Sequence, residues 1–539
     1  MLRLYPFFGK KELHYYDNLA SYFVAKTFKK SFMYKRGYRF LLIAISLFMM
    51  MNLQSQTTNK PNIILIYTDD LGYGDVSAYG TAAIKTPNID RLAKNGVRFT
   101  NAHATSATCT PSRFSLLTGK YAWRKQGTGI APGDASLLIP VSTTTLPGML
   151  QKGGYHTAVI GKWHLGLGDE KGADWNGRIA PGPIEIGFNY SFLIPATGDR
   201  VPCVFVENHS VVNLDKKDPI KVSYKEPLDP NAPTGKKNPE LLKLHPSHGH
   251  DMTIVNGISR IGYMSGGNAA LWKDEDFANI LVQKATTYIT QQKSKPFFLY
   301  FSTHDIHVPR IANERFVGKS GMGPRGDVLL QLDWTVGQIE AVLKKNGLLE
   351  NTLIIFTSDN GQVIDDGYKD DAVEKLGTHQ PNGIFRGGKY SAFEAGTRVP
   401  FIVSWPAKVK AGKVNDALFS QIDLYASLAN MIGVPISEGQ AQDSKNALPI
   451  LLNQRAEPRE FLVEQSLNST LSLLVGNWKY IEPSKGPKIN KDTNTELGNL
   501  PEPQLYNLAD DPGETKNLAS VYPEKVNEMK IKLEQIKQK

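Results

Sequence analysis

Short apolar runs alternate with amphipathic stretches along most of the chain. Runs of about four to eight apolar residues predict strands that are buried on both faces, as in the middle of a parallel sheet. Such strands are expected over residues 61–68, 156–160, 296–302, 351–357 and 400–405. Helices are expected at the intervening stretches of residues 88–96, 144–152, 276–294, 326–347 and 421–432. The alternation predicts an α/β fold with a mostly parallel central sheet that is covered by helices on both faces.

The rest of the chain has a different character. Residues 168–270 are rich in glycine, proline and asparagine, and we expect long loops with small strands there. After residue 455, short runs predict antiparallel strands over residues 460–475, 478–481 and 504–508, and a charged helix over 523–539. The mature chain is therefore divided into a main domain, residues 57–454, and a small α+β C-terminal subdomain, residues 455–539.

Four of the predicted strands end in polar clusters. These clusters are Asp69-Asp70, the segment from Lys162 to His164, the segment from His304 to His307, and Asp359-Asn360. Ligands of open α/β sheets bind beyond the carboxyl ends of the strands. Polar residues placed by chance would fall on helix surfaces as often, so we expect one site that gathers these four ends.

Three carboxylates and one amide among these residues form a set of hard ligands. Asp69, Asp70, Asp359 and Asn360 offer oxygen atoms, which suit Ca²⁺ or Mg²⁺ better than zinc. Carboxylates that crowd together repel one another, and a bound cation is the simplest way to hold them. Each pair alone has an alternative explanation, since Asp-Asp can cap a helix and Asp-Asn-Gly can form a turn.

The composition is that of a globular protein, not of a disordered, collagenous or coiled-coil chain. Hydrophobic residues make up 41% of the 539 residues and charged residues 21%. The net charge of +10 comes mainly from residues 1–39, which hold nine Lys/Arg and two acidic residues and leave +3 for the rest. We therefore expect no nucleic-acid partner. The two cysteines, Cys109 and Cys203, exclude a disulfide framework and a zinc site built on paired cysteines.

The N-terminus has the pattern of a secretory signal. Basic residues at 35–39 precede an apolar run over residues 40–51 and a polar exit, which predicts a signal peptide and an upstream extension within residues 1–56. Met33 is a candidate for the true start, because the stretch before it is unusual for a signal. The apolar run is shorter than the roughly 20 residues of a membrane span, and an uncleaved anchor is the alternative. We expect an exported protein, periplasmic or secreted, with no stable membrane span after removal of the signal.

The most specific motif begins at Cys109. Cys109-Thr-Pro-Ser-Arg113, followed by Leu117-Thr-Gly119, is similar to the type I sulfatase signature Cys-x-Pro-Ser-Arg-x-x-x-Leu-Thr-Gly. The resemblance continues in order through Asp69-Asp-Leu-Gly-Tyr-Gly-Asp75, Gly161-Lys-Trp-His-Leu-Gly166, His307-Val-Pro309, Ser358-Asp-Asn-Gly361 and Arg386-Gly-Gly-Lys389. The chain thus resembles a bacterial, arylsulfatase-like glycan sulfatase of the alkaline phosphatase superfamily, whose fold agrees with the predicted one.

The resemblance implies a modified cysteine and a metal ion. In the family, the cysteine that matches Cys109 is oxidised to formylglycine by a maturation enzyme, and a hydroxyl of the hydrated aldehyde attacks the sulfur of a sulfate ester. The formylglycine–sulfate intermediate then releases sulfate as the second hydroxyl loses its proton. The family's metal is usually Ca²⁺, one per chain, and its ligands match Asp69, Asp70, Asp359, Asn360 and the modified Cys109. Outside such a motif, a buried structural cysteine would be the ordinary interpretation, and Cys203 is expected to be a free thiol.

The resemblance also implies a role for each remaining residue of the motifs. Arg113 would hold the hydrated aldehyde, and Lys162 and Lys389 would bind the sulfate oxygens and stabilise negative charge. His164 would take a proton from the formylglycine hydroxyl, and His307 would protonate the leaving alcohol.

Two neighbouring residues have less specific expectations. His304 is expected to contact the substrate or support the site without acting in catalysis. Arg398 is expected to pair with a carboxylate of the metal site.

The implied function is hydrolysis of sulfate esters on O-sulfated sugars of a glycan. Polar and aromatic residues of the long loops suit sugar hydroxyls and ring faces, although such residues can equally face solvent. The candidates are residues 174–176, 199–200, 207–208 and 248–251. One alternative is a phosphoester or phosphonate hydrolase of the same superfamily, although two lysines with ligands for one metal favour sulfate. The other alternative is a non-catalytic glycan-binding pseudo-enzyme. The presence of all the catalytic residues of the family motifs argues against it.

Overall fold

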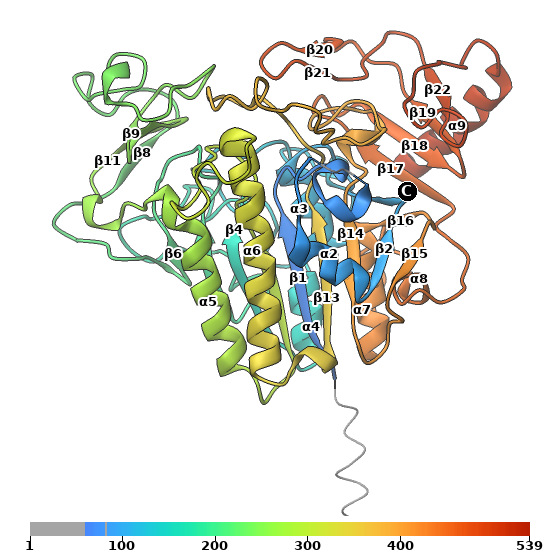
Figure 1. Ribbon diagram of the computed structural model, residues 1–539, viewed down its shortest axis with the longest axis horizontal. Coiled ribbons are helices and arrows are strands. Elements are labelled where there is room, and N and C mark those ends of the chain that lie inside the picture. The colour runs from blue at the N-terminus through green and yellow to red at the C-terminus, as the bar shows by residue number, and fades with distance from the viewer. Residues whose placement is uncertain (1–59, 81–82) are drawn as a thin grey trace, which may run out of the picture. The chain divides into compact units, whose positions relative to one another are not determined.

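The predicted strands meet in one central sheet (Figure 1). The computed structural model describes residues 60–80 and 83–539. Within these residues the sheet has ten strands, in the order β15 (Lys413–Asn415), β2 (Val97–Phe99), β14 (Phe401–Ser404), β13 (Thr352–Ser358), β1 (Asn62–Thr68), β12 (Phe297–Ser302), β4 (His156–Lys162), β5 (Tyr190–Ile194), β6 (Val206–Glu207) and β7 (Ser210–Val211). β1 pairs in parallel with both β12 and β13, and β4 and β5 extend the parallel part. The mostly parallel sheet of the predicted α/β fold is confirmed.

The direction of one predicted strand was not foreseen. The strand expected over residues 400–405 is β14, which pairs antiparallel with β13 on one side and β2 on the other. β6 and β7, at the opposite edge, are antiparallel as well. The direction of a strand depends on the path of its connecting segments, and the apolar pattern within the strand does not encode that path.

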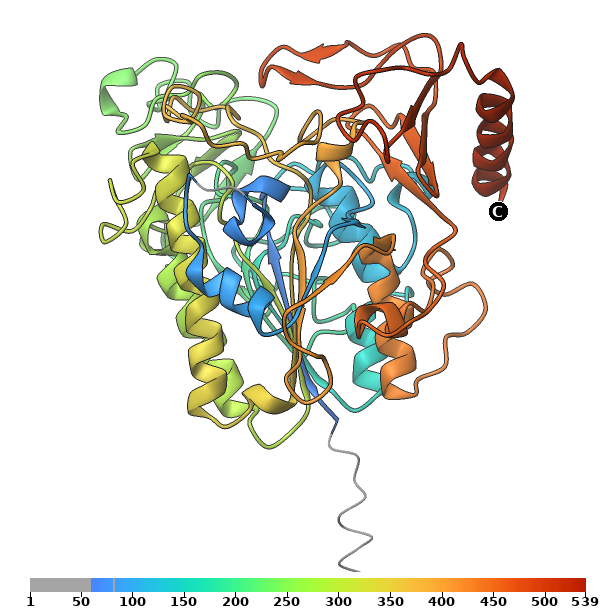
Figure 2. The same cartoon turned by 45° about the vertical axis from the view of Figure 1, so that its right-hand side comes forward.

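Helices cover both faces of the sheet, as predicted (Figure 2). One group consists of α2 (Pro87–Lys94), α5 (Phe277–Gln291) and α6 (Gly323–Lys345), and the other of α3 (Cys109–Thr118), α4 (Leu146–Lys152) and α7 (Leu424–Ile432). The short helix α8 (Leu448–Leu451) packs beside α7. In α5, Leu281, Ala285 and Ile289 recur every four residues and are all buried, which explains why this stretch forms a helix against the sheet.

Helix α3 carries the most specific motif of the chain, yet the apolar pattern does not predict it. All ten of its residues are buried, so no polar face marks a helical period. Pro111 is its third residue, in the first turn, where a proline removes no hydrogen bond of the helix. Gly119 ends the helix in the left-handed region with φ of 66°, the conformation that favours glycine.

Residues 168–270 form loops with short strands, as expected. β8 (Lys221–Ser223) pairs with β11 (Tyr263–Ser265), and β9 (Ile254–Val255) pairs with β10 (Ile258–Ser259). Elsewhere in the main part, β3 (Ala102–His103) pairs with β16 (Phe419–Ser420).

After residue 455 the chain forms a second, antiparallel sheet. Its four strands among the described residues are β17 (Phe461–Gln465), β18 (Leu471–Val475), β19 (Trp478–Ile481) and β22 (Gln504–Asn507). A hairpin of β20 (Ile489–Asn490) and β21 (Thr495–Glu496) and the terminal helix α9 (Pro523–Gln538) complete the segment (Figure 2). The elements have the predicted α+β character, and the boundary at residue 455 stays a prediction, since residues 61–539 form one compact unit.

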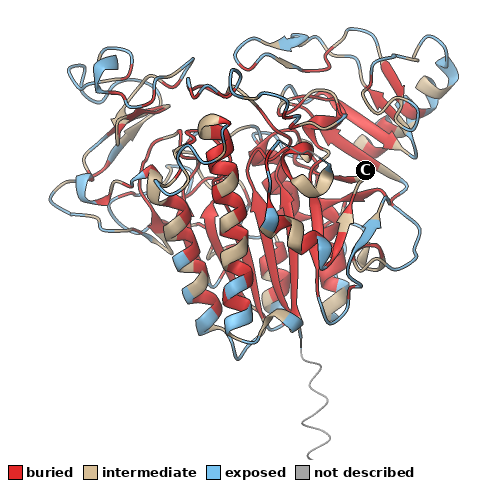
Figure 3. Ribbon diagram, viewed as in Figure 1, coloured by how far each residue is buried: buried red, intermediate tan, exposed pale blue. Residues whose placement is uncertain are grey.

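The core follows the parallel strands (Figure 3). Every residue of β1 and of β13 is buried, as continuous apolar runs predict. The predicted signal peptide falls outside the described residues. Over the ranges that the structure describes, we find no helix whose length and apolar character would let it cross a membrane.

Candidate active site

The polar strand ends meet at the carboxyl edge of the central sheet. Asp69 and Asp70 follow β1, Lys162 ends β4, and Asp359 follows β13. β1 and β13 are parallel neighbours in register, so the residues that follow them lie side by side. All four side chains are buried.

Three carboxylates form the centre of this site. Oxygen atoms of Asp69, Asp70 and Asp359 lie within 4.8 Å of one another. Burial raises the pKa of Asp69 well above its usual value, and the neighbouring Asp359 raises it further. Burial also raises the pKa of Asp70, against the opposing effect of the Lys389 ammonium. Burial would raise the pKa of Asp359 too, but the Arg113 guanidinium and the Lys162 and Lys389 ammonium groups together outweigh it, and the pKa lies below its usual value.

The same cluster presents oxygen atoms that lack partners. Asp69 Oδ1 and Asn360 Oδ1 are buried and accept no hydrogen bond from any described residue. Asn360 Nδ2 donates to Asp70 Oδ1 at 2.8 Å, which holds the amide beside the carboxylates. Buried polar atoms are nearly always satisfied, so two unpartnered oxygens among three carboxylates fit a hard divalent cation with oxygen ligands.

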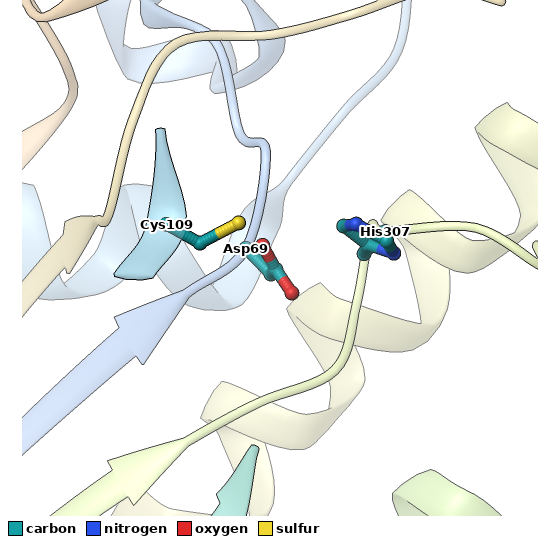
Figure 4. A group of neighbouring side chains, drawn as sticks. All are labelled: Asp69, Cys109 and His307. Atoms are coloured by element: carbon teal, nitrogen blue, oxygen red, sulfur yellow. The ribbon is translucent and has the colours of Figure 1, made fainter. Parts of the chain in front are cut away.

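Cys109, the first residue of α3, lies beside the carboxylate of Asp69 (Figure 4). Its Sγ, an oxygen of Asp69 and a nitrogen of His307 lie within 4.8 Å of one another. Burial raises the pKa of the thiol to about 11, although the Lys162 and Lys389 ammonium groups act against it. An unmodified thiol here is therefore protonated and weakly nucleophilic at neutral pH.

Arg113 lies one helical turn after Cys109, on the same side of α3. Its Nε and Nη2 donate to Asp359 Oδ2 at 3.0 and 2.6 Å, and its Nη1 donates to Ser302 Oγ. The side chain is fully buried. These bonds fix the guanidinium between the start of α3 and the carboxylate cluster.

Two buried lysines pair with the carboxylates. Lys162 Nζ forms an ion pair with Asp69 Oδ2. Lys389 Nζ lies 2.8 Å from Asp70 Oδ2 and 2.7 Å from Asp366 Oδ2. Ammonium groups held at this place can bind the oxygens of an anion.

Two buried histidines have their ring orientation set by backbone carbonyls. His164 Nε2 donates to the Ala131 carbonyl oxygen at 2.9 Å, and its Nδ1 has no partner among the described residues. His307 Nδ1 donates to the carbonyl oxygen of the next residue at 2.7 Å, and its Nε2 lies 3.7 Å from Asp70 Oδ2. Burial is the main cause that lowers the pKa of both rings well below the usual value, so each ring is neutral before an anion binds.

Three further expectations can be compared with the structure. His304 supports the wall of the site: its Nε2 accepts a hydrogen bond from Gly198 N at 3.1 Å, and burial lowers its pKa to about 3. The expected pairing of Arg398 with a metal-site carboxylate is wrong, because Arg398 Nη1 donates to Glu394 Oε2, four residues earlier, at 3.0 Å. Cys203 is a buried free thiol, as expected.

A cavity of about 230 Å³ adjoins Cys109. Its wall includes His164, His307 and Lys389, and also residues 199–200 and 248–250 of the loops chosen from the sequence. The other two candidate loop segments lie outside this wall, since Trp175 is buried and Glu207 pairs with Lys284 at 2.8 Å.

Several residues of the cavity wall were not predicted. They are Asp366, Tyr390, Asn490, Asp492 and Thr493. The last three come from the β20–β21 hairpin and the turn within it, so the C-terminal segment supplies part of the wall. Tyr390 directly follows the Lys389 motif, which could have marked it, and its hydroxyl donates to Asp366 Oδ1 at 2.9 Å. Nothing in the sequence around Asp366 distinguishes it from other loop carboxylates.

A buried carboxylate with three flanking donors faces the cavity from the loops, and one of these donors is the Thr197 hydroxyl, which donates to Asp199 Oδ1. Arg200 Nη1 donates to both oxygens of Asp199 at 2.9 Å, and His250 Nε2 lies 3.0 Å from Asp199 Oδ2. Burial would raise the pKa of Asp199, but the Arg200 guanidinium, His250 and His307 together outweigh it and hold the pKa well below its usual value. The group is an ionised acceptor that can bind the hydroxyls of a polar ligand.

The fold and the site together define a hydrolase of the alkaline phosphatase type, with carboxylates, lysines and histidines at the carboxyl edge of a mostly parallel sheet. Comparisons with known proteins narrow this class. A family model described as Sulfatase matches residues 61–434. The chain is 58% identical over 482 residues to an N-acetylgalactosamine-6-O-sulfatase of Bacteroides thetaiotaomicron, over 89% of this chain and 94% of that protein.

More distant relatives and a solved structure agree. Human arylsulfatase A is 32% identical over 474 residues, which cover 85% of this chain and 83% of that protein. A solved structure from work on glycosaminoglycan metabolism by Bacteroides thetaiotaomicron has a TM-score of 0.88 and 57% identity, over 89% of this chain and all of that chain. The chain belongs to the sulfatase family and is a hydrolase of sulfuric esters.

Proposed function

We propose that this sulfatase removes the 6-O-sulfate of N-acetylgalactosamine in a sulfated glycan. The observation that carries the proposal is the cavity at the strand ends, where Cys109 lies next to the carboxylate cluster. The chain is also 58% identical to an enzyme of that specificity. The cavity of about 230 Å³ is smaller than the roughly 300–1,000 Å³ of pockets for drug-sized ligands. Its size suits one sulfated sugar residue.

One Ca²⁺ ion is proposed at the carboxylate cluster, with Asp69, Asp70, Asp359, Asn360 and the modified Cys109 as ligands. The unpartnered oxygens Asp69 Oδ1 and Asn360 Oδ1 support this set. A divalent cation bound there would act as a Lewis acid that stabilises negative charge on the sulfate. Arg113 balances the charge of Asp359 through an ion pair of 2.6 Å.

Cys109 is proposed to be converted to formylglycine by a maturation enzyme. The protonated thiol, with a pKa of about 11, is a poor nucleophile as it stands, which supports a modified side chain. The hydrated aldehyde supplies a hydroxyl nucleophile and a second hydroxyl that allows sulfate to leave. His164, whose Nδ1 has no partner among the described residues, is proposed to take the proton in that second step.

The lysines and His307 act on the sulfate and the leaving alcohol. Lys162 and Lys389 are proposed to bind the sulfate oxygens and to stabilise the negative charge that grows in the transition state. His307 Nδ1 donates its hydrogen bond to a backbone carbonyl, so Nε2 is the atom that would protonate the alcohol. The negative charge of the bound sulfate ester beside the ring raises its pKa, which allows the neutral histidine of the free site to take up a proton.

The sugar is proposed to bind through the loop residues of the cavity. Asp199 lines the cavity and its pKa is held well below the usual value, so it is a charged acceptor that a sugar hydroxyl can share with Thr197, Arg200 and His250. Arg200 and His250 orient this carboxylate and offer further polar contacts. Export by the N-terminal signal is proposed as well, because a glycan substrate lies outside the cytoplasm.

Mass spectrometry of the peptide that contains Cys109 tests the nucleophile. Conversion to formylglycine lowers the mass by about 18 Da, and we expect this shift in protein from its native host. A plain thiol in that protein would remove the proposed chemistry.

A panel of esters tests the substrate. We expect N-acetylgalactosamine 6-sulfate to be hydrolysed at least about 100-fold faster, by kcat/KM, than the 4-sulfate, because the sulfated carbon must reach Cys109 while Asp199 holds the ring. Faster hydrolysis of aryl phosphate than of aryl sulfate would instead favour a phosphoester hydrolase. The absence of any turnover by the modified protein would favour a glycan-binding pseudo-enzyme.

A further inference from the structure

A second and larger cavity lies across the loop that contacts His164. It measures about 970 Å³ and is lined by the end of α3, the loop that follows and the C-terminal sheet and helix. Gly129 belongs to its wall, whereas the next residue, Ile130, belongs to the wall of the catalytic cavity. Ala131 anchors this shared loop, since its carbonyl oxygen accepts from His164 Nε2 at 2.9 Å and its amide donates to Thr110 Oγ1 at 3.1 Å.

The wall of the second cavity is cationic. Arg124 and Lys537 are held by acidic partners, at 2.8 Å from Asp443 and 2.6 Å from Glu482. Lys125 is exposed and Lys120 is half-buried, and neither ammonium pairs with a carboxylate in the described part of the chain. The two free ammonium groups give the cavity a net positive charge that an anionic ligand would offset.

The neutral part of the wall combines aromatic rings with amide groups. The rings of Tyr121 and Trp123 stack with centroids 5.4 Å apart, and the Arg124 guanidinium lies 4.4 Å from the centroid of the Trp123 ring. Gln465 lines the cavity with only 6% of its surface exposed, and its Oε1 has no hydrogen-bond partner among the described residues. Aromatic faces, amides and free ammonium groups together match the ring faces, hydroxyls and acidic groups of an anionic sugar.

We propose that this cavity is a second, non-catalytic binding site for a sulfated oligosaccharide. The proposal rests on the proposed function for the kind of glycan. A cavity of about 970 Å³ has room for several sugar residues, whereas the catalytic cavity of about 230 Å³ suits one. A glycan held in the second cavity stays close to the catalytic cavity, which raises its effective concentration there.

The test uses the full-length double variant Lys120→Glu/Lys125→Glu. The matched control is Lys408→Glu/Lys410→Glu, which makes the same change of charge at two exposed lysines that line neither cavity. Calorimetric titration with a chondroitin 6-sulfate hexasaccharide is carried out in a Cys109→Ala background, so that no turnover occurs. We expect two sites per chain, and a loss of affinity of about tenfold or more at one of them in the Lys120/Lys125 variant alone.

Steady-state kinetics provide the second readout. The KM for polymeric chondroitin 6-sulfate is expected to rise about tenfold in the Lys120/Lys125 variant, while kcat and KM for N-acetylgalactosamine 6-sulfate stay unchanged. A single binding site in the titration, or an equal loss in the control variant, overturns the proposal. Two binding sites in the titration, together with no hydrolysis of the monosaccharide ester by the wild-type protein, would overturn the proposed substrate and leave the second site standing.

Discussion

The catalytic carboxylates can be compared with a second buried carboxylate cluster, which joins the main part of the chain to the C-terminal sheet. Glu394, Glu464 and Glu514 form that second cluster, and all three are buried. Lys479 Nζ lies among them, 2.9 Å from Glu394, 3.4 Å from Glu464 and 3.5 Å from Glu514. His103 Nδ1 adds a contact to Glu464 at 2.9 Å.

In the catalytic cluster the cations are arranged differently. Within this cluster, Lys162, Lys389 and Arg113 each make their shortest ion pair with a different aspartate, and Arg113 Nη2 also lies 3.9 Å from Asp69 Oδ1. No single cation of the described chain lies among all three carboxylates. Asp69 Oδ1 and Asn360 Oδ1 therefore have no donor. Glu514 Oε1 in the second cluster lacks a hydrogen bond as well, but it lies 3.5 Å from the Lys479 ammonium.

The comparison separates a site from a structural network of the same residue types. Where the chain places its own ammonium at the centre, the carboxylates need no further cation and the cluster fastens two parts of the fold. Where the centre presents only oxygens next to a cavity, the cluster is ready to bind a metal and an anion. Substitutions in the first cluster should therefore change activity, and substitutions in the second should change stability.

The largest effect is expected for Cys109→Ala. Loss of the nucleophile should lower kcat by a factor on the order of 10⁶, as for other hydrolases whose nucleophile is removed. The thermal midpoint should change little, because the side chain pairs with no partner that holds the fold. Turnover of a sulfated sugar and thermal unfolding check both parts. Cys203→Ala, which removes the other buried thiol, is the control and should keep its activity; turnover retained by Cys109→Ala would contradict the assignment.

A smaller and selective loss is expected for His307→Ala. Without the proton donor, hydrolysis of a sugar sulfate should fall about 10²–10⁴-fold, whereas nitrophenyl sulfate, whose alcohol leaves without protonation, should fall less than about tenfold. Rates on the two substrates give the comparison. His209→Ala, at a half-buried histidine outside the cavity, is the control. Equal losses on both substrates would exclude the role of general acid.

Much of the fold could be predicted from the sequence because buried parallel strands consist of continuous runs of apolar residues. The run over residues 61–68 became β1 at Asn62–Thr68, and the run over 351–357 became β13 at Thr352–Ser358. The antiparallel direction of β14 could not be predicted, because the residues of a strand do not encode its direction. The helix α3 could not be predicted either, because all of its residues are buried and show no helical period of polar and apolar positions.

The candidate site shows the same division. The proximity of residues at strand ends, such as Asp69 and Asp359, could be predicted because parallel strands end at the same edge of a sheet. Asp366 and Asp492 lie in irregular segments, and only the path of the chain brings them to the cavity. Arg398 was assigned wrongly because its partner, Glu394, is a local one within the same turn of chain.

In the second cluster, Lys479→Met is expected to lower the free energy of unfolding by about 3–5 kcal/mol, since it leaves buried carboxylates without their cation. The kcat of the protein that remains folded should stay within about twofold, because Lys479 lies outside the catalytic cavity. Chemical denaturation and turnover measured on the same samples separate the two effects. The control Lys525→Met removes an exposed ion pair with Glu528 and should cost at most about 1 kcal/mol. A large loss of kcat with unchanged stability would reverse the assignment of the two clusters.

The smallest effect is expected for Glu514→Gln, and it depends on pH. Burial raises the pKa of Glu514 from 4.5 to about 8, against the opposing effect of Lys479. Below about pH 4.5 the carboxyl is protonated in both the folded and the unfolded chain, and between that value and about pH 8 only the folded chain keeps the proton. The free energy of unfolding of the wild type therefore falls as the pH rises through this window.

The glutamine side chain is neutral at every pH, so this fall should be absent from the Glu514→Gln variant. Denaturation curves at pH 5, 6.5 and 8 give the difference between the two proteins at each pH. The informative quantity is the change of that difference with pH, because a constant offset can arise from the altered hydrogen bond to Glu394 N. Glu524→Gln, on the exposed side of α9, makes the same chemical change and should leave the pH dependence as it is. Parallel curves for wild type and Glu514→Gln would mean that Lys479 compensates all three carboxylates in their ionised form. The second cluster would then differ from the catalytic one only in the place of its cation.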